Sequence, residues 1–109
     1  MSTTHKAPYY AVIFSSTLSD NAEGYGEMAA RMVELAREQE GFIDVESAAR
    51  TTEGFGITVS YWKDLESIRR WKAQSEHAAA QRMGRDAFYR SYRLRIAKVE
   101  RECVFDRGE

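Results

Sequence analysis

The best candidates for chemistry lie in one short stretch, residues 54–84, which contains both tryptophans and one of the two histidines of the chain. His77 is the best general base by residue type, because an imidazole with an ordinary pKa of ~6.5 can exchange a proton near neutral pH. The same residue also suits a structural role, as a helix cap or at the edge of the core. The sequence leaves both roles open for His77.

Trp71 is the second candidate, because an indole ring can form the wall of a pocket for a planar molecule. It can equally be the residue that anchors a helix in the core. Phe14, Tyr61 and Trp62 carry the same two interpretations, and Arg93 either places a cation beside an anionic intermediate or faces water. We therefore predict His77 and Trp71 as catalytic residues, and Phe14, Tyr61, Trp62 and Arg93 as substrate-binding residues.

Other kinds of site have little support in the sequence. Two histidines and one cysteine, far apart in the chain, do not form a zinc-binding pattern, and the glycine-containing segments GFG, GYG and MGR are not phosphate-binding loops. Ser15, Ser16 and Asp20 lack the spacing of a hydrolytic triad. We predict no metal site and no cofactor.

Length and composition are typical of one compact domain. The chain has 109 residues, 43% of them hydrophobic and 30% charged, which is enough for one core but too little for two. We predict a single domain over residues 9–105, with a flexible N-terminal tail at 1–8 and a C-terminal tail at 106–109.

Charge and cysteine content limit the partners and the compartment. The formal charge of −1 disfavours nucleic acid as a partner, although residues 82–101 are rich in basic side chains that either form surface ion pairs with the acidic residues of the first half or contact nucleic acid. No run of apolar residues is long enough to span a membrane. Cys103 is the single cysteine, so we expect no intrachain disulfide and a cytoplasmic location.

The pattern of apolar residues predicts the elements that must position these side chains. Runs of β-branched and aromatic residues predict strands, and apolar residues three and four apart predict helices. Asp64 is expected to cap the second helix, Gly41 to end the first, and a break near Ala73 followed by a new start at Ser75 would angle His77 relative to Trp71. The final strand is expected to carry a bulge or a change of environment near Ala97. The predicted strands are 9–16, 42–50, 57–62 and 92–105, and the predicted helices are 25–36 and 65–84.

This order, β-α-β-β-α-β, predicts an α+β fold of the ferredoxin-like type, a four-stranded antiparallel sheet with both helices on one face. The predicted strands are apolar on both sides, as in Tyr9 to Phe14 and Phe55 to Trp62. A sheet with two apolar faces needs a second cover. We therefore predict a homodimer in which two sheets face each other.

Several segments also resemble a known family: GYGEMAARMVELAREQEGF, VES, GFGITVSYWKDLESIRRWKAQSEHAAAQ and YRLRIAKVER. Together they are similar to the antibiotic biosynthesis monooxygenase family of small dimeric α+β barrel proteins, over about Tyr9 to Glu102. The resemblance implies a dimeric α/β barrel that acts, without a cofactor, on a small aromatic, polyketide- or quinol-like molecule and on molecular oxygen. A non-catalytic dimeric barrel that binds a small hydrophobic ligand is the alternative.

A haem-degrading branch of the same superfamily provides a third possibility. Its tryptophans match Trp62 and Trp71, but its axial histidine falls on Gln81 of this chain, and its first-strand asparagine falls on Phe14 or Ser15. An amide is a poor substitute for an imidazole as an iron ligand. The resemblance therefore favours cofactor-free chemistry over haem degradation.

Overall fold

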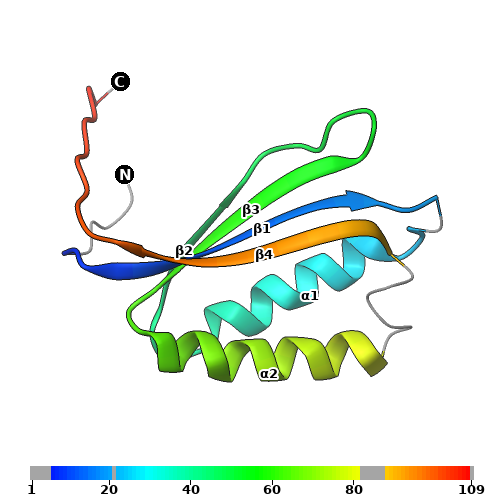
Figure 1. Cartoon of the computed structure of the whole chain (residues 1–109), viewed down its shortest axis with the longest axis horizontal. Coiled ribbons are helices and arrows are strands. Elements are labelled where there is room, and N and C mark those ends of the chain that lie inside the picture. Colours follow the sequence, from blue (N-terminus) through cyan, green and yellow to red (C-terminus); the bar gives the residue numbers. More distant parts are fainter. Residues whose placement is uncertain (1–5, 21, 82–87, 109) are drawn as a thin grey trace.

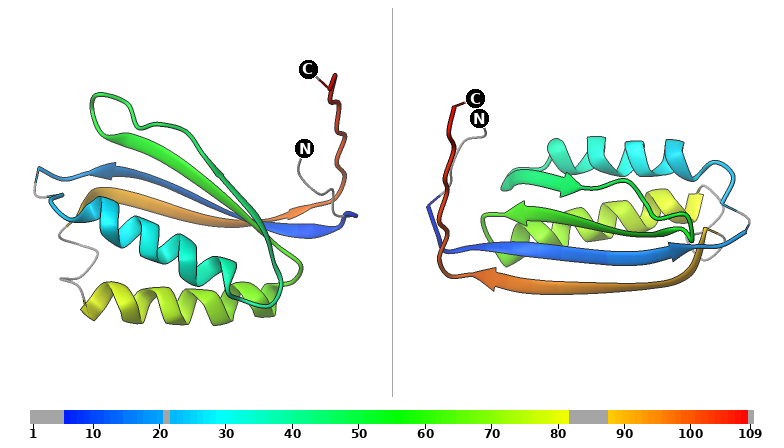
Figure 2. Two further views of the ribbon diagram at one scale, coloured as in Figure 1. Left: turned by 180° about the vertical axis from the view of Figure 1, so that it is seen from behind. Right: turned by 90° about the horizontal axis from the view of Figure 1, so that it is seen from above.

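The computed structural model describes residues 6–20, 22–81 and 88–108, and for residues 75–81 the backbone alone. Six elements follow one another as predicted, and they make one four-stranded antiparallel sheet in the order β2-β3-β1-β4 (Figure 1). Both helices cover the same face of the sheet, and the other face is open (Figure 2). This confirms the α+β, ferredoxin-like prediction. The elements are β1 Tyr9–Leu18, α1 Tyr25–Arg37, β2 Phe42–Ser47, β3 Phe55–Trp62, α2 Leu65–Gln81 and β4 Tyr89–Val99.

Strand pairing decides which side chains face the helices. Phe14 pairs with Thr58 on one side and with Leu94 on the other, and paired residues share a face of the sheet. The neighbouring residues Ile13 and Val59 pair with each other and face the opposite way. The even-numbered residues of β1 and β3 therefore face the helices, and the odd-numbered residues form the open face.

The core lies where the N-terminal part of α2 meets the sheet. Trp62 is fully buried there, together with Val12, Ala36 and Ile68, each no more than 4% exposed. Burying side chains of this size contributes roughly 1.5–3 kcal/mol each to the free energy of folding. Within the described ranges, neither helix is long and apolar enough to span a membrane.

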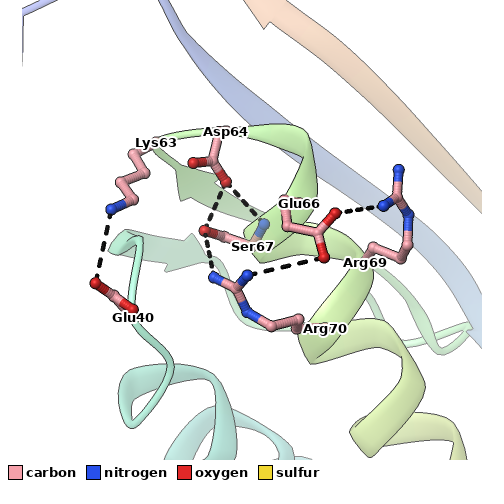
Figure 3. Close-up of polar contacts among 7 residues, drawn as sticks. All are labelled: Glu40, Lys63, Asp64, Glu66, Ser67, Arg69 and Arg70. Carbon is pink, nitrogen blue, oxygen red and sulfur yellow. Dashed lines mark hydrogen bonds and ion pairs between the residues drawn. The ribbon is translucent and has the colours of Figure 1, made fainter.

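The start of α2 agrees with the predicted cap. Oδ1 of Asp64 accepts hydrogen bonds from the backbone N–H of Ser67 at 2.8 Å and from its hydroxyl at 2.7 Å (Figure 3). Hydrogen bonding from the Ser67 side chain, and then from its backbone, lowers the pKa of the Asp64 carboxyl. Ion pairs of Glu66 with Arg69 and Arg70 follow in the first turns. Asp64 therefore stabilises α2 in its ionised form.

The predicted interruption of α2 near Ala73 is wrong, because the helix runs without a break to Gln81. Serine at position 75 has a helix propensity only ~0.5 kcal/mol below that of alanine, which is less than the loss of the helical hydrogen bonds that a break would cause. The consequence is geometric. In a regular helix, positions 71 and 77 lie about 120° apart around the axis.

Four smaller expectations also need correction. The first helix ends at Arg37, with Glu38 as its C-cap, so Gly41 does not cap it. Gly41 does have a positive φ of 97°, and its carbonyl accepts a hydrogen bond from the N–H of Lys63 at 2.9 Å. A Cβ at position 41 would overlap the Ser67 hydroxyl and lie 2.7 Å from its Cβ.

The strand ends follow from the available pairing partners. β4 spans Tyr89–Val99 instead of 92–105, since Val99 pairs with Tyr9, the first residue of β1. β2 stops at Ser47 instead of 50. No register shift occurs near Ala97, and the irregularity lies at the opposite end of the ladder, between Thr17 and Leu18.

Candidate functional site

A pocket of about 340 Å³ lies between the sheet and the two helices. All six elements contribute to it, and its walls are mainly apolar and aromatic, as is usual for small-molecule sites. Its lining residues are Val12, Phe14, Tyr25, Met28, Ala29, Met32, Val33, Ala36, Val45, Thr58, Ser60, Trp71, Lys72, Tyr89, Tyr92 and Leu94.

Local sequence patterns place these walls. The pocket-facing residues of α1 recur at helical spacing, and two of them, Met28 and Met32, have flexible side chains that adapt to ligands of different shape. Strands contribute every second residue, as in Val12 and Phe14 of β1. The pocket is therefore the space that the helix-facing side chains of the sheet leave unfilled.

Trp71 brings an unusual polar atom to this site. Its Nε1 is buried and has no hydrogen-bond partner among the residues that the structure describes. The other tryptophan differs: Nε1 of Trp62 donates to the Ser60 hydroxyl at 2.9 Å. The two rings contact each other at 5.3 Å between centroids, so Trp62 fixes the position of Trp71. A buried donor without a partner destabilises the protein by about 1–3 kcal/mol, and a ligand oxygen that accepted from it would remove that penalty.

An aromatic cluster forms another part of the pocket wall. The ring of Tyr89 contacts the rings of Phe14, Tyr25 and Tyr92 at centroid distances of 5.4, 5.6 and 5.5 Å. Burial, and next a hydrogen bond with the Tyr25 hydroxyl, raise the pKa of Tyr89, because the protonated phenol is the donor in that bond. Tyr89 is therefore a neutral hydrogen-bond donor at physiological pH.

Arg50 contacts this cluster through Tyr25. Its Nη1 donates to the carbonyls of Ser16 at 3.1 Å and Gly54 at 2.7 Å. Its Nη2 donates to the Ser16 hydroxyl at 2.8 Å and to the Tyr25 hydroxyl at 2.9 Å, and its Cζ lies 5.0 Å from the centre of the Tyr25 ring. Glycine is needed at position 56, because a Cβ there would lie 2.9 Å from Cγ of Arg50. The guanidinium is thus fixed in place by four hydrogen bonds.

The structure brings two of the predicted site residues together in the pocket, Phe14 and Trp71. Trp62 is fully buried behind Trp71, so it supports the position of Trp71 but exposes no surface that a substrate could contact. Tyr61 and Arg93 do not fit this pocket, because their strand neighbours Trp62 and Leu94 face the helices and they face the opposite way. A one-residue alternation separates the two faces.

Tyr61 has a structural partner on the open face. Its hydroxyl donates to Oε1 of Glu46 at 2.8 Å, and its ring lies 5.9 Å from that of Tyr9. Burial, followed by the hydrogen bond to Glu46, raises the pKa of Tyr61 to about 12. Tyr61 thus belongs to the pairing of β2 with β3.

The side chains of His77 and Gln81 lie outside the part of the chain that the structure describes. The expected helix break that would angle His77 relative to Trp71 is absent. His77 therefore stays a prediction from residue type.

Sequence reasoning missed Arg50, Tyr25 and Tyr89 as site residues. Tyr25 appeared only as the first residue of an apolar helical stripe, and Arg50 only as the end of a strand. Arg50 bonds to Ser16, 34 positions away in the chain, and to Tyr25, 25 positions away, and no local pattern encodes such distant contacts. Within the described residues, no group of three or more His, Cys, Asp and Glu side chains is arranged to hold a metal ion.

Comparison with known proteins gives a consistent result. The model of the antibiotic biosynthesis monooxygenase family matches residues 8–83. An uncharacterized protein of Bacillus subtilis (strain 168), YqjZ, is 52% identical over 105 residues, which is 96% of this chain and 91% of the relative.

Two further proteins are similar at greater distance. A jasmonate monooxygenase of Pyricularia oryzae is 33% identical over 61 residues, which cover 55% of this chain and 28% of that protein. The crystal structure of SnoaB, a cofactor-independent oxygenase from Streptomyces nogalater, has a TM-score of 0.72 at 16% identity, covering 92% of this chain and all of SnoaB. At that identity the structural likeness shows a shared fold.

Proposed function

Because the chain belongs to the antibiotic biosynthesis monooxygenase family, we propose that it is a cofactor-independent monooxygenase acting on a small aromatic, polyketide- or quinol-like molecule in the pocket between sheet and helices. SnoaB, which has the same fold, is a cofactor-independent oxygenase, and the jasmonate monooxygenase shares part of the sequence. Both likenesses support oxygenation as the class of reaction.

The observation that carries the proposal is an aromatic pocket lined by Trp71, whose buried N–H has no hydrogen-bond partner among the described residues. Aromatic walls suit a flat ring system, and a volume of about 340 Å³ is at the small end of the usual range for ligand sites. An indole N–H can only donate a hydrogen bond. The bound molecule should therefore present an oxygen acceptor to Trp71.

For such a substrate, the main task of the protein is to promote loss of a proton from the substrate. Loss of a proton from a methylene group between two conjugated systems gives a carbanion whose charge spreads to a ring oxygen. This electron-rich anion reduces molecular oxygen, a carbon–oxygen bond forms, and protonation gives a hydroperoxide. Loss of water then leaves a carbonyl, so that CH₂ and O₂ become C=O and H₂O. Donors that stabilise the oxyanion accelerate the first step.

We keep His77 as the predicted base on the strength of its side-chain type, and Trp71 as a group that contacts the substrate oxygen. The test is oxygen uptake with a panel of anthrones and naphthoquinols, with a chelator present and no added metal or flavin. Loss of a positioned general base in His77→Ala should reduce the rate by roughly 10²–10⁴-fold. An unchanged rate in this variant would remove His77 from the mechanism and leave the pocket assignment intact.

The same panel separates the alternatives. Saturable binding without oxygen uptake above the heat-denatured control would identify a carrier or sensor of hydrophobic ligands. Haem degradation predicts a one-to-one haem complex with a histidine-ligated spectrum and ring opening on reduction. Weak, spectrally undefined haem adsorption would argue against it, since an apolar pocket adsorbs haem without ligating it.

A homodimer is the second part of the proposal. On the open face, Phe55 and Ile57 of β3 are 42% and 45% exposed, which is unusual for large apolar side chains in a sheet. Residues 100–108 lie on the same side, away from the helices, and contain the exposed Val104 and Phe105 (Figure 1). A second copy on this face would bury about 2,000 Å² or more. A stable monomer in light scattering at micromolar concentration would contradict the dimer.

A further inference from the structure

We infer that the hydroxyl of Tyr25, held by Arg50 and next to the ring of Tyr89, forms an oxyanion-binding end of the pocket, where an ionised phenol or enolate oxygen of the ligand is bound. This inference rests on the proposed function, and it specifies the charge state and orientation of the bound molecule. Neither tyrosine nor Arg50 belongs to the site that the sequence predicts.

The first argument is the charge of Arg50. An arginine side chain is always protonated, and this one is half-buried. Among the residues that the structure describes, its hydrogen-bond partners are two carbonyls and two hydroxyls, all neutral. In an environment of reduced dielectric, an arginine without a carboxylate partner favours an anion nearby.

Tyr25 connects the charge of Arg50 to the pocket, which is the second argument. Tyr25 links the two, because its hydroxyl accepts from Nη2 of Arg50 while its side chain lines the pocket. A phenol that accepts from a cation becomes a stronger donor, because the accepted bond draws electron density from its oxygen. Tyr25 thus presents to the pocket a hydroxyl whose oxygen is already hydrogen-bonded to the guanidinium.

The third argument is a count of donors and acceptors. The Tyr25 oxygen accepts from Arg50 and from the Tyr89 hydroxyl, which occupies its lone pairs. Its own proton is then left to donate to another acceptor. A ligand oxyanion in the pocket would accept from Tyr25, while Tyr89, whose own proton is engaged by the Tyr25 oxygen, lines the same wall and polarises that donor.

The fourth argument is rigidity. Arg50 is held by the backbone of β1 and of the β2–β3 turn, through the carbonyls of Ser16 and Gly54, so the donors are in place before a ligand arrives. Donors that need no reorganisation stabilise developing negative charge most effectively. Trp71 lines the same pocket and has a buried N–H without a partner among the described residues, so a planar molecule with two oxygen acceptors would suit the site if that N–H is the second donor.

The test uses a chromogenic phenol, 4-nitro-1-naphthol, whose anion absorbs visible light, and needs no turnover. Titrating the probe with protein at several pH values gives separate dissociation constants for the naphthol and the naphtholate. The parent protein should bind the anion at least about tenfold more tightly than the neutral form. In Tyr25→Phe the ratio of the two dissociation constants should fall by about ten- to a hundredfold, or the preference for the anion should disappear, because a hydrogen bond to a charged group is lost. Tyr89→Phe should reduce it in the same direction.

Two controls make the result specific. Tyr10→Phe removes a hydroxyl from a tyrosine on β1 that does not line the pocket, and it should leave the preference unchanged. Lys72→Gln removes a cation that lines the pocket directly. Circular dichroism of each variant establishes that it is folded. Tyr25→Phe leaves the backbone contacts of Arg50 intact, so it is the decisive variant in place of an Arg50 substitution.

The outcomes separate this inference from the proposed function. A parent protein that does not bind the probe, or binds both forms equally, overturns the oxyanion site. So does a preference that survives Tyr25→Phe and disappears in Lys72→Gln. A parent that prefers the anion through Tyr25 but consumes no oxygen with any substrate upholds the oxyanion site and refutes the monooxygenase proposal.

Discussion

Replacing Trp71 with phenylalanine should weaken ligand binding and leave the free energy of unfolding nearly unchanged. The reason is the buried Nε1, which has no partner among the residues that the structure describes. Phenylalanine removes this donor, and with it a penalty of about 1–3 kcal/mol. The smaller ring also loses apolar contacts worth about 1–3 kcal/mol. The two terms oppose each other and are of similar size.

The ligand-bound protein should respond differently. If a ligand oxygen accepts from the indole N–H, its loss weakens binding by about 0.5–1.5 kcal/mol for a neutral acceptor and about 1.5–3 kcal/mol for an anion. The dissociation constant of 4-nitro-1-naphtholate should therefore rise by roughly tenfold or more, since about 1.4 kcal/mol corresponds to a factor of ten.

Trp62→Phe is the matched control, because the two indoles lie in contact but, of the two, Trp62 alone has a hydrogen-bond partner within the described part of the chain. Here the substitution leaves the Ser60 hydroxyl without its donor and creates a cavity in the core, so the free energy of unfolding should fall by about 2–4 kcal/mol. Urea unfolding of both variants, with titration of the probe, measures both quantities. If Trp71→Phe destabilises as strongly as Trp62→Phe and binds the probe as tightly as the parent, the interpretation of Trp71 as a donor to the ligand is refuted.

Three further predictions concern the framework of the site. Asp64→Ala should lower the thermal midpoint at neutral pH but not in acid. The reason is that Ser67 lowers the pKa of this carboxyl from its ordinary value of 3.8, so its contribution to stability disappears as the pH falls through the folded-state pKa. Melting curves across pH test this, and a difference that persists in acid would contradict it. Gly41→Ala should lower the free energy of unfolding by more than the ~1–2 kcal/mol that a left-handed backbone costs alanine, because the new Cβ overlaps Ser67. Gly24 also has a positive φ, but a Cβ there meets no atom within 4 Å, so Gly24→Ala should show the backbone effect alone in urea unfolding. Ile57→Asp should give a folded monomer in light scattering and circular dichroism, because this side chain is 45% exposed in the single chain; a dimer of unchanged affinity would show that the open face is not the interface.

The order and type of the elements were readable from the sequence, because they depend on interactions between near neighbours. Alternating β-branched and aromatic residues define β1 and β3, and the spacing of Met28, Met32 and Ala36 defines α1. Asp64 is a local signal as well, since its hydrogen bonds reach three residues along the chain. Six such elements in this order have few ways to pair, so the fold followed.

The site depended on information that the sequence does not hold locally. Because the side chains of a strand alternate between faces, the choice of buried face put Trp62 in the core and Tyr61 outside, although both are aromatic neighbours. α2 continues through residue 75 because the helical hydrogen bonds outweigh the ~0.5 kcal/mol that serine costs relative to alanine, so a single serine does not predict a break. The hydrogen bonds of Arg50 to Ser16 and Tyr25 form only when β1, α1 and the β2–β3 turn meet, so tertiary packing alone determined the polar end of the pocket.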